Sequence, residues 1–454
     1  MVSRPSQRPP LPEGPFLVVG LARSGVAAAE ALRARGERVY GTDSGNPPAA
    51  ARLAELGVEV VLDGDGTELL DCVSAVVKSP GVPASAPPIE GARERGIEVL
   101  GELELGWRML PNRFVAVTGT NGKTTVAEWL GHVWREAGAD VVVAGNVGRP
   151  LASLAGSTDP ASTVVCECSS FQLEDSAAFA PEVAVLLNVS PDHLDRHGTL
   201  EGYLEAKLRI FANQGPDAAA VVDADEPAVE GLELPGRALR VPYGIDACAD
   251  AEERCAVSFS DGEISDAQGP LIAASDVALA GEHNLRNAMA VAACALSAGI
   301  ERSAVARGLR SFGGVPHRLE RVAEIGGVAF VNDSKATNAA AAAAALRTFE
   351  GGVRPILGGS VKGGNFRELA PAVAERAVGC YLIGEAEAQL AADLAGSGVP
   401  LFGCGDLASA FARAVADARA GETVLLAPAC ASFDAFRDYE ERGERFRELV
   451  EGLR

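Results

Sequence analysis

The sequence lacks the features that would place the protein in a membrane, on a secretory route or on a nucleic acid. No apolar run approaches the ~20 residues of a membrane-spanning helix, and the Pro-rich polar stretch after Met1 does not resemble a signal peptide. Basic residues number 40 against 62 acidic ones, and the net charge of −22 disfavours a duplex or an anionic bilayer. We therefore expect no nucleic-acid partner, no membrane insertion and a cytoplasmic location.

The nine cysteines show no Cys-x-x-Cys spacing. Their odd number and scattered positions favour reduced, buried thiols over a disulfide framework. The 454 residues are 48% hydrophobic and 22% charged, which supplies enough apolar surface for folded cores. At ~100–200 residues per domain, this length predicts about three domains.

A glycine-rich loop is the most informative feature present: Gly119-Thr120-Asn121-Gly122-Lys123-Thr124-Thr125, between an apolar run at 114–117 and a helical pattern at 126–137. A strand, such a loop and a helix hold nucleotide phosphates, because backbone N–H groups and the helix N-terminus face the oxyanions. Lys123 would reach the β/γ-phosphates and the Thr124 hydroxyl could ligate Mg²⁺. Val117 replaces the first glycine of the standard P-loop, so this is a shorter form. We expect ATP here, the alternative being an ordinary glycine turn.

Breaker residues divide the chain into a tail and three blocks. The expected boundaries are a flexible tail at 1–14, followed by domains at 15–110, 111–313 and 314–454. Each domain alternates apolar strand patterns with helical patterns, which predicts parallel sheets covered by helices. The fold class is therefore α/β with three domains: a Rossmann-like N-terminal domain, a central P-loop-type ATPase domain and a Rossmann-like C-terminal domain.

The first strand, at 16–19, leads into a turn at 20–25 that resembles a dinucleotide fingerprint. Asp43 follows the next strand at about the distance needed to contact a ribose. Ala22, however, replaces the middle glycine, which hinders the usual approach of a pyrophosphate. We expect a nucleotide other than NAD(P) at this helix N-terminus, while NAD(P) binding and a purely structural turn remain alternatives.

Polar clusters follow several predicted strands of the second block. Glu167 and Ser169 follow the strand at 163–165, and the segment 188–197 contains His193 and His197. Ligands bind at the carboxyl ends of strands in α/β sheets, and Mg²⁺ takes oxygen ligands, so Glu167 and Thr124 form a candidate pair around the ATP phosphates. A zinc site on the two histidines and a structural loop are the alternatives for the segment 188–197.

Two further features concern charged side chains. Lys207 lies in a helical segment at 201–211. A lysine in such a segment is most often a solvated surface residue, and the neighbours of Lys207 do not settle its role. In the third block, the segment 332–338 combines acidic, basic and hydroxyl side chains after a predicted strand, and the segment 428–434 is a similar cluster with a hydroxyl and an acidic side chain. Such a combination suits a charged substrate.

Together, the motifs at 119–125, 169–174, 283–284, 317–318 and 333–335 resemble those of the Mur ligases, the ATP-dependent amino-acid ligases of peptidoglycan precursor synthesis. The resemblance runs from about Phe16 to the C-terminus. The segments 332–338 and 432–443 resemble the members that add D-glutamate, and the Asp-Asn-Pro-Arg signature expected of diaminopimelate-adding members is absent.

The resemblance implies an enzyme, an amide-bond ligase that adds D-glutamate to UDP-N-acetylmuramoyl-L-alanine through an acyl phosphate, giving ADP and phosphate. It implies ATP and two Mg²⁺ ions as cofactors and a monomeric protein. The implied catalytic residues are Lys123, Glu167, His193 and Lys207. The implied Mg²⁺ ligands are Thr124, Glu167, His193 and Lys207, the last as a carbamylated lysine.

By resemblance, each domain also contributes binding residues. The ATP set is Gly119, Thr120, Asn121, Gly122, Lys123, Thr124, Thr125, Asn284, Asn287, Arg318 and Asp333. The set for the UDP substrate is Ala22, Arg23, Ser24, Asp43, Ser44, Ser79, Gly81, Asn146, Ser169 and Gln172, and the amino-acid set is His193, Lys335, Thr337, Lys362, Ser432 and Phe433. A paralogue that adds another acidic amino acid such as L-glutamate, and a non-catalytic nucleotide-binding protein, remain alternatives.

Overall fold

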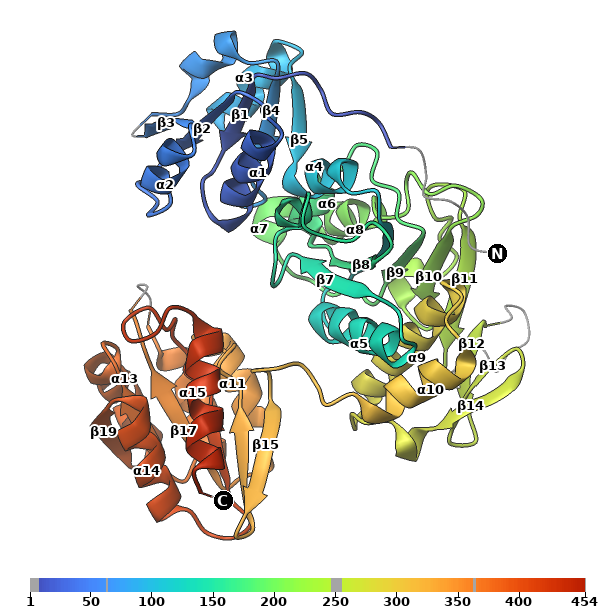
Figure 1. Ribbon diagram of the computed structural model, residues 1–454. Helices are drawn as coiled ribbons and strands as arrows, with labels where there is room; N and C mark the ends of the chain where they lie inside the picture. The colour runs from blue at the N-terminus through green and yellow to red at the C-terminus, as the bar shows by residue number, and fades with distance from the viewer. Residues whose placement is uncertain (1–7, 63, 246–254, 362–364, 454) are drawn as a thin grey trace. The chain divides into compact units, whose positions relative to one another are not determined.

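Alternating strands and helices build three β-sheets in the computed structural model, which describes residues 8–62, 64–245, 255–361 and 365–453 (Figure 1). The chain forms two compact units, Met1–Phe312 and Gly313–Arg454. The first unit contains two of the sheets and the second unit contains the third. The predicted α/β class with three domains is confirmed.

The first sheet has five parallel strands in the order β3-β2-β1-β4-β5. Its central strands are wholly buried, and apolar side chains of the neighbouring helices cover them. The strands are β1 (Phe16–Val19), β2 (Val39–Asp43), β3 (Glu59–Leu62), β4 (Ala75–Lys78) and β5 (Glu98–Gly101), and the helices are α1 (Arg23–Ala34), α2 (Ala50–Glu55), α3 (Pro87–Glu94) and α4 (Glu102–Met109).

The second sheet has nine strands in the order β14-β13-β12-β11-β10-β9-β6-β8-β7, of which only the β12-β13-β14 pairings are antiparallel. The strands are β6 (Arg113–Thr118), β7 (Val141–Gly145), β8 (Thr163–Glu167), β9 (Val183–Leu186), β10 (Ala219–Asp223), β11 (Leu239–Gly244), β12 (Val257–Ser260), β13 (Glu263–Asp266) and β14 (Gly269–Ala273). The helices are α5 (Lys123–Glu136), α6 (Ser170–Leu173), α7 (Leu194–His197), α8 (Leu200–Leu208), α9 (Glu282–Ser297) and α10 (Arg302–Ser311). The helix expected at 126–137 thus begins earlier, at Lys123.

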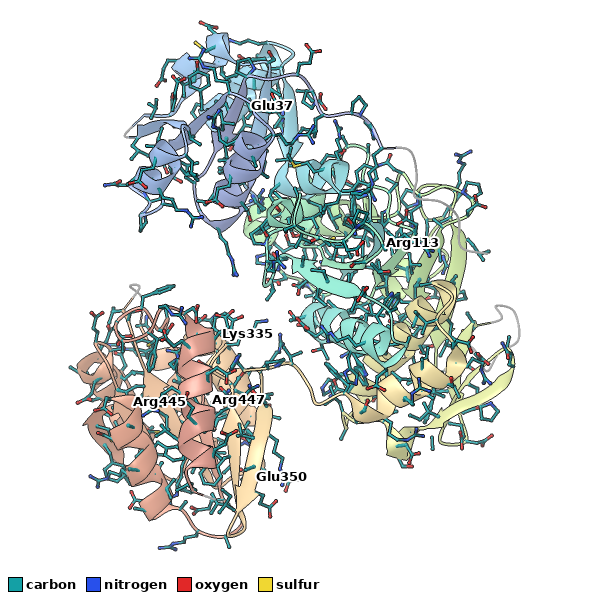
Figure 2. The ribbon with its side chains drawn as sticks, viewed as in Figure 1. Glu37, Arg113, Lys335, Glu350, Arg445 and Arg447 are labelled. Carbon is teal, nitrogen blue, oxygen red and sulfur yellow. The ribbon has the colours of Figure 1, made fainter. Side chains whose placement is uncertain are left out.

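The third sheet has six strands in the order β15-β16-β20-β17-β18-β19, and only β15 is antiparallel to its neighbour. The strands are β15 (Glu320–Ile325), β16 (Val328–Asn332), β17 (Val353–Gly358), β18 (Cys380–Ile383), β19 (Leu401–Gly405) and β20 (Thr423–Leu426). The helices are α11 (Ala339–Arg347), α12 (Ala370–Arg376), α13 (Glu387–Leu394), α14 (Leu407–Asp417) and α15 (Tyr439–Glu451), the last with Arg445 and Arg447 labelled in Figure 2.

The described part of the expected N-terminal tail contacts the first unit. The Arg8 guanidinium lies 5.0 Å from the ring centroid of Trp107 and 5.1 Å from that of Phe114. Burial lowers the pKa of Arg8 to about 10. Arg108 donates a hydrogen bond of 3.3 Å to the Pro10 carbonyl. Residues from Arg8 onward are therefore in contact with α4 and β6.

Most cysteines fulfil the expectation of reduced, buried thiols. The free and buried ones are Cys166, Cys168, Cys294, Cys380 and Cys430. Cys255 differs from that expectation, because it is disulfide-bonded. In the part of the chain that the structure describes, no helix combines the length and the apolar character needed to cross a bilayer.

The connection between the first two sheets depends on a buried carboxylate in α4. Glu104 is fully buried and accepts hydrogen bonds from the backbone N–H groups of Ala177, Ala178 and Phe179, at 3.0 to 3.2 Å. It also accepts a hydrogen bond of 2.7 Å from Arg108 Nε. These bonds attach α4 to the segment that precedes β9.

We expect Glu104→Ala to lower the free energy of unfolding of the first unit by about 3–5 kcal/mol, because the buried Arg108 loses its buried partner and three amides lose their acceptor. Glu98→Ala is the matched control, since exposed Glu98 also pairs with Arg108, at 3.1 Å. This control should change stability by less than about 1 kcal/mol. Urea unfolding followed by tryptophan fluorescence measures both, and equal losses would contradict the prediction.

Candidate active site

The glycine-rich loop connects β6 to α5 in a conformation that requires glycine at its end. Gly122 has a φ of 82°, and a Cβ added there would lie 2.6 Å from Asn287 Oδ1. Both the left-handed backbone and the close approach of Asn287 exclude a side chain. At the start of the loop, Thr118 Oγ1 donates a 2.9 Å hydrogen bond to the Cys168 carbonyl, which ties the end of β6 to the residue after β8.

Asn188, just beyond the end of β9, holds the loop from the other side. Its carbonyl accepts a hydrogen bond of 2.9 Å from the Thr120 amide, and its side-chain oxygen accepts one of 2.9 Å from the Asn121 amide. Sequence analysis placed this asparagine at a strand end and gave it no role. A signal was present, because a polar side chain directly after a buried strand lies at the edge where the loop is expected.

Lys123 and Lys207 both reach the carbonyl of Gly119. Lys123 Nζ lies 2.9 Å from this oxygen and 2.8 Å from the Thr120 carbonyl, and Lys207 Nζ lies 2.7 Å from the Gly119 oxygen. The structure thus contradicts the solvated position that is usual for a lysine of such a segment, because the Lys207 side chain is buried in α8. Burial first, and then the positive charge of Lys123, lower the pKa of Lys207 to about 7.

Tyr203 is a site residue that sequence analysis missed. Lys207 Nζ lies 4.2 Å from the centroid of its ring, and its hydroxyl lies 3.4 Å from Thr120 Oγ1. The two residues are separated by one helical turn in α8, so the i,i+4 spacing of an aromatic and a lysine could have indicated the contact. Tyr203 therefore contacts both Lys207 of α8 and Thr120 of the glycine-rich loop.

Glu167 ends β8 beside the loop, with β6 on one side and β7 on the other. Its carboxylate is buried and accepts a hydrogen bond of 3.0 Å from Asn146 Nδ2. Thr124 is buried in the first turn of α5. Over the described ranges, no three His, Cys, Asp or Glu side chains gather to hold a metal. Oxygen ligands from Glu167 and Thr124 suit Mg²⁺, which commonly takes few protein ligands and completes its shell with phosphates and water.

The two histidines of the segment 188–197 have different surroundings. His193 is half-exposed, has a left-handed φ of 51°, and its ring centroid lies 4.8 Å from that of Phe171. His197 is nearly buried in α7, with Nε2 3.0 Å from Ser170 Oγ and Nδ1 3.3 Å from Glu174 Oε1. Because His197 has these other partners, the zinc alternative gains no support from the geometry of the described residues.

Two of the residues expected to hold the UDP substrate, Asp43 and Ser79, lie at the carboxyl edge of the first sheet. Asp43 Oδ2 accepts a hydrogen bond of 2.6 Å from the Leu21 amide, and Ser79 Oγ donates one of 2.7 Å to the Gly20 carbonyl. Ala22 is the N-cap of α1 and supplies no side-chain cap. Asp43 and Ser79 therefore hold the turn at 20–21 that leads into this twelve-residue helix.

Ser169 and Gln172 are engaged with each other. The Gln172 amide oxygen accepts hydrogen bonds from the Ser169 backbone N–H at 3.0 Å and from its hydroxyl at 3.1 Å, and the Ser169 hydroxyl accepts one from the Gln172 backbone. This capping box begins α6. The buried Gln172 side chain thus orients Ser169, and contact of either residue with a substrate stays a prediction.

The predicted adenine and ribose residues are divided between the two units. Asn287 approaches Gly122, as described above, and its Nδ2 lies 3.4 Å from Asn284 Oδ1 on the same helix, α9. The structure therefore brings Asn287 to the glycine-rich loop and places Asn284 beside Asn287. Arg318 and Asp333 belong to the second unit, where Asp333 Oδ1 accepts a hydrogen bond of 3.2 Å from the Leu319 amide and burial raises the pKa of Asp333 to about 6.

In the second unit, the fully buried Arg442 of α15 joins the two loops that carry the predicted amino-acid residues. It donates hydrogen bonds to Ser334 Oγ and to the carbonyls of Ser334, Cys430 and Ala431, at 2.9 to 3.2 Å. The loop that contains Ser334 continues with Lys335, labelled in Figure 2, and Thr337. The loop that contains Cys430 and Ala431 continues with Ser432 and Phe433. Lys362 lies outside the described residues. Sequence analysis quoted Arg442 within a motif without a role.

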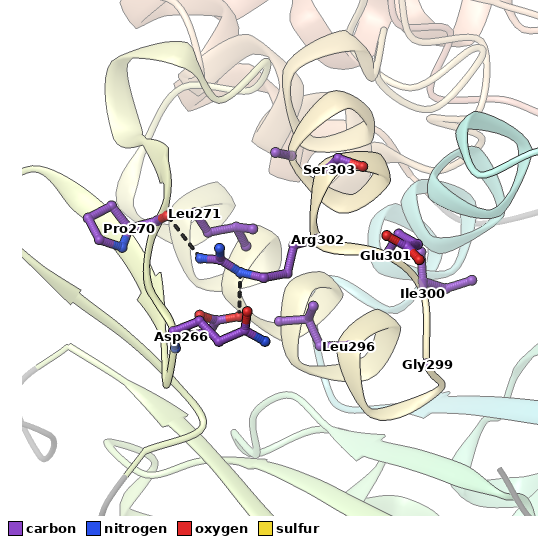
Figure 3. Close-up of a pocket in the computed structure, with 11 residues that line it drawn as sticks. Asp266, Pro270, Leu271, Leu296, Gly299, Ile300, Glu301, Arg302 and Ser303 are labelled. Carbon is purple, nitrogen blue, oxygen red and sulfur yellow. Dashed lines mark hydrogen bonds and ion pairs between the residues drawn. The ribbon is translucent and has the colours of Figure 1, made fainter. Parts of the chain in front are cut away.

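A pocket of about 670 Å³ lies elsewhere in the first unit, where α10 begins beside β13 and β14 (Figure 3). Arg302 spans it, with Nε 2.9 Å from Asp266 Oδ2 and Nη2 2.9 Å from the Pro270 carbonyl. None of the predicted site residues lines this pocket.

Known proteins are similar to this chain over nearly its whole length. Residues 15–101 match the MurD-like N-terminal domain of Mur ligases, residues 117–295 the Mur ligase middle domain, and residues 317–430 the Mur ligase, glutamate ligase domain. A UDP-N-acetylmuramoylalanine--D-glutamate ligase of Acidobacterium capsulatum is 40% identical, covering 96% of this chain and 95% of its own length. The enzyme of the same name from Pelotomaculum thermopropionicum is 41% identical, covering 96% and 97%.

A solved structure shows the same fold at low identity. The UDP-N-acetylmuramate-alanine ligase MurC from Thermotoga maritima superposes with a TM-score of 0.59 at 18% identity, covering 97% of this chain and all of that one. Similarity at this level concerns the fold alone, whereas identities near 40% over nearly the full length establish kinship. The chain, with its three matched domains and its glycine-rich loop between β6 and α5, belongs to the Mur ligase family.

Proposed function

We propose that the protein uses ATP to join D-glutamate to UDP-N-acetylmuramoyl-L-alanine, in the cytoplasmic synthesis of peptidoglycan precursors. The observation that carries the reaction class is the meeting of the glycine-rich loop, Glu167 and the buried Lys207 at one edge of the second sheet. The substrates are proposed from the relatives, which share the name UDP-N-acetylmuramoylalanine--D-glutamate ligase and are similar to nearly the whole chain. The protein would act as a monomer.

The chemistry requires activation of a carboxylate, because direct amide formation in water is unfavourable. An oxygen of the terminal alanine carboxylate forms a bond to the γ-phosphorus of ATP, and the bond to ADP breaks. The amine of D-glutamate then bonds to the carbonyl carbon of this acyl phosphate, and phosphate leaves. Both steps move negative charge between oxygens, so fixed positive groups and N–H donors supply the main catalytic effect.

The loop residues have separate roles in the first step. Lys123, now bonded to loop carbonyls, would turn to the β/γ-phosphates, and the amides at the start of α5 would face the phosphate oxygens. Thr124 and Glu167 would hold Mg²⁺, with His193 and Lys207 contributing to a second ion. When bound, Mg²⁺ neutralises part of the negative charge on the phosphoryl oxygens.

Lys207 would act as a carbamate. A lysine amine combines with CO₂ only when it is unprotonated, and the pKa of about 7 leaves a large neutral fraction at neutral pH. The carbamate replaces a cation beside Lys123 with an anion that can support a metal site. This exchange removes the like-charge repulsion between two lysines that share one carbonyl oxygen.

D-Glutamate would bind through the second unit. Its two carboxylates suit Lys335 and Lys362, and the hydroxyls of Thr337 and Ser432 would complete the contacts beside Phe433. The Phe433 side chain is exposed to solvent. His193 could accept the proton that the amine loses on attack.

The defining experiment mixes the purified protein with Mg-ATP and UDP-N-acetylmuramoyl-L-alanine, and adds D-glutamate, L-glutamate or neither. We expect phosphate release that depends on D-glutamate, together with a product heavier by one glutamyl residue. Phosphate release with L-glutamate alone would support the ligase reaction and would identify L-glutamate, not D-glutamate, as the amino-acid substrate. Independence from both amino acids would refute the proposal.

Gly122→Ala should weaken ATP binding at least about tenfold, because the added Cβ meets Asn287 and the left-handed backbone becomes strained. Gly138→Ala is the matched control at the other end of α5, since Gly138 is also left-handed but has open space around its Cβ position. Titration calorimetry with a non-hydrolysable ATP analogue compares the two variants. Equal affinities would show that the loop does not bind the nucleotide as proposed.

The pH dependence of Lys207 has a definite sign. Its pKa falls from 10.5 to about 7 on folding, so the neutral amine that reacts with CO₂ increases as pH rises through 7. We expect ¹³C NMR in ¹³C-bicarbonate to show a protein carbamate signal that grows from pH 6 to pH 8. Lys207→Met should remove the signal and Lys335→Met should retain it. Persistence of the signal in Lys207→Met would contradict the assignment.

A further inference from the structure

Two consecutive carboxylates after α6, Glu174 and Asp175, each hold a cation. Asp175 Oδ2 lies 2.7 Å from Lys78 Nζ, and both side chains are buried. Glu174 Oε2 lies 2.7 Å from Arg196 Nη2 and 3.2 Å from Arg196 Nε, a forked contact. Charge-assisted bonds with this geometry are stronger and more directional than bonds between neutral groups.

Both cations then bind the loop that follows β4. Arg196 Nη1 donates a hydrogen bond of 2.9 Å to the Pro80 carbonyl, and Lys78 Nζ donates one of 2.8 Å to the Val82 carbonyl. This loop contains Ser79, whose hydroxyl bonds to Gly20 in the turn before α1. The loop of the first sheet is therefore attached to the second sheet at two points.

At its other end, Arg196 belongs to the helix that begins directly after His193. Its guanidinium carbon lies 4.2 Å from the ring centroid of Phe171, the same ring that His193 contacts at 4.8 Å. His197 in the same helix also bonds to Glu174. Arg196 thus contacts both the loop at 79–82 and the Phe171 ring that lies against His193.

The two attachments differ in what they connect. Lys78 lies in β4, so its bonds to Asp175 and Val82 fix the loop without involving α7. Arg196 is the side chain through which a change in the loop reaches the helix beside His193. A lysine cannot reproduce this arrangement, because one ammonium group lacks the planar fork that serves Glu174 and Pro80 together.

We propose that Arg196 is a positioning residue that transmits nucleotide binding at the 79–82 loop to His193. The identity of the nucleotide as uridine diphosphate rests on the proposed function. Occupation of the loop orders Pro80, the Pro80 carbonyl fixes the guanidinium, and the guanidinium fixes α7 and the Phe171 ring against His193. The substrate thereby helps to assemble the site at which it reacts.

Hydrogen exchange with UDP as the probe tests this transmission without any turnover. In the wild-type protein, UDP should slow exchange of the amides at 81–84 and also at 192–198. In Arg196→Met, protection at 81–84 should remain and protection at 192–198 should be lost, and Arg196→Lys should restore it only in part. If Arg196→Met does not fold, Glu174→Gln removes the charge that holds the guanidinium and should give the same loss.

Arg302→Met is the matched control. Arg302 pairs with the Asp266 carboxylate of β13 and donates hydrogen bonds to two carbonyls of β14, and these strands are far from the two loops in the sequence (Figure 3). It should leave both protected segments as in the wild type. In steady-state assays, Arg196→Met should raise the KM for the UDP substrate about tenfold, the effect of one lost charge-assisted bond, and leave the KM for ATP unchanged.

UDP-dependent protection at 192–198 that survives in Arg196→Met would overturn the proposal, as would its absence in the wild type. An equal loss in Arg302→Met would overturn it too, because the effect would then be general destabilisation. Failure of D-glutamate ligation in the wild type refutes the proposed function instead, because the exchange experiment involves neither ATP nor an amino acid.

Discussion

The sharing of the Gly119 carbonyl by two lysine side chains constrains the whole centre of the first unit. Lys123 and Lys207 approach the same oxygen, and burial makes two positive charges there expensive. Burial, and after it the charge of Lys123, depresses the pKa of Lys207, whose amine also lies over the Tyr203 ring. A phosphate loop therefore lies beside a lysine that is poised to lose its charge.

Features encoded locally could be predicted from the sequence. The glycine-rich loop, the strands before it and the polar clusters at strand ends depend on short patterns, and the structure places Glu167 and Asn188 beside that loop as those patterns imply. Lys207 could not be placed from its own neighbours, because its partner Gly119 is 88 residues away in the sequence. The resemblance to the Mur ligases, and not the residues around it in the sequence, predicted a role for Lys207 in the site.

Longer-range contacts explain the other omissions. Arg196 and Pro80 are separated by 116 residues, and Arg442 and Ser334 by 108, so no window of sequence contains either pair. Both arginines join loops from different strands, and a loop's own residues give no indication of what holds it in place. The short antiparallel strands β13 and β14 and the pocket beside them were also not predicted from the sequence.

The buried or partly buried Lys78, Lys123 and Lys207 belong to a small set, because lysine otherwise occurs in the sequence only at 335 and 362. All other basic side chains apart from histidine are arginines, so most of the basic charge of the chain is carried by guanidinium and not by amine. Amine-directed crosslinkers, fluorophores and coupling resins would therefore find few surface targets and would compete for the groups that line the active centre. Loss of activity on such treatment would report on those groups, and attachment for biophysical work is better directed to an introduced cysteine or to a terminus.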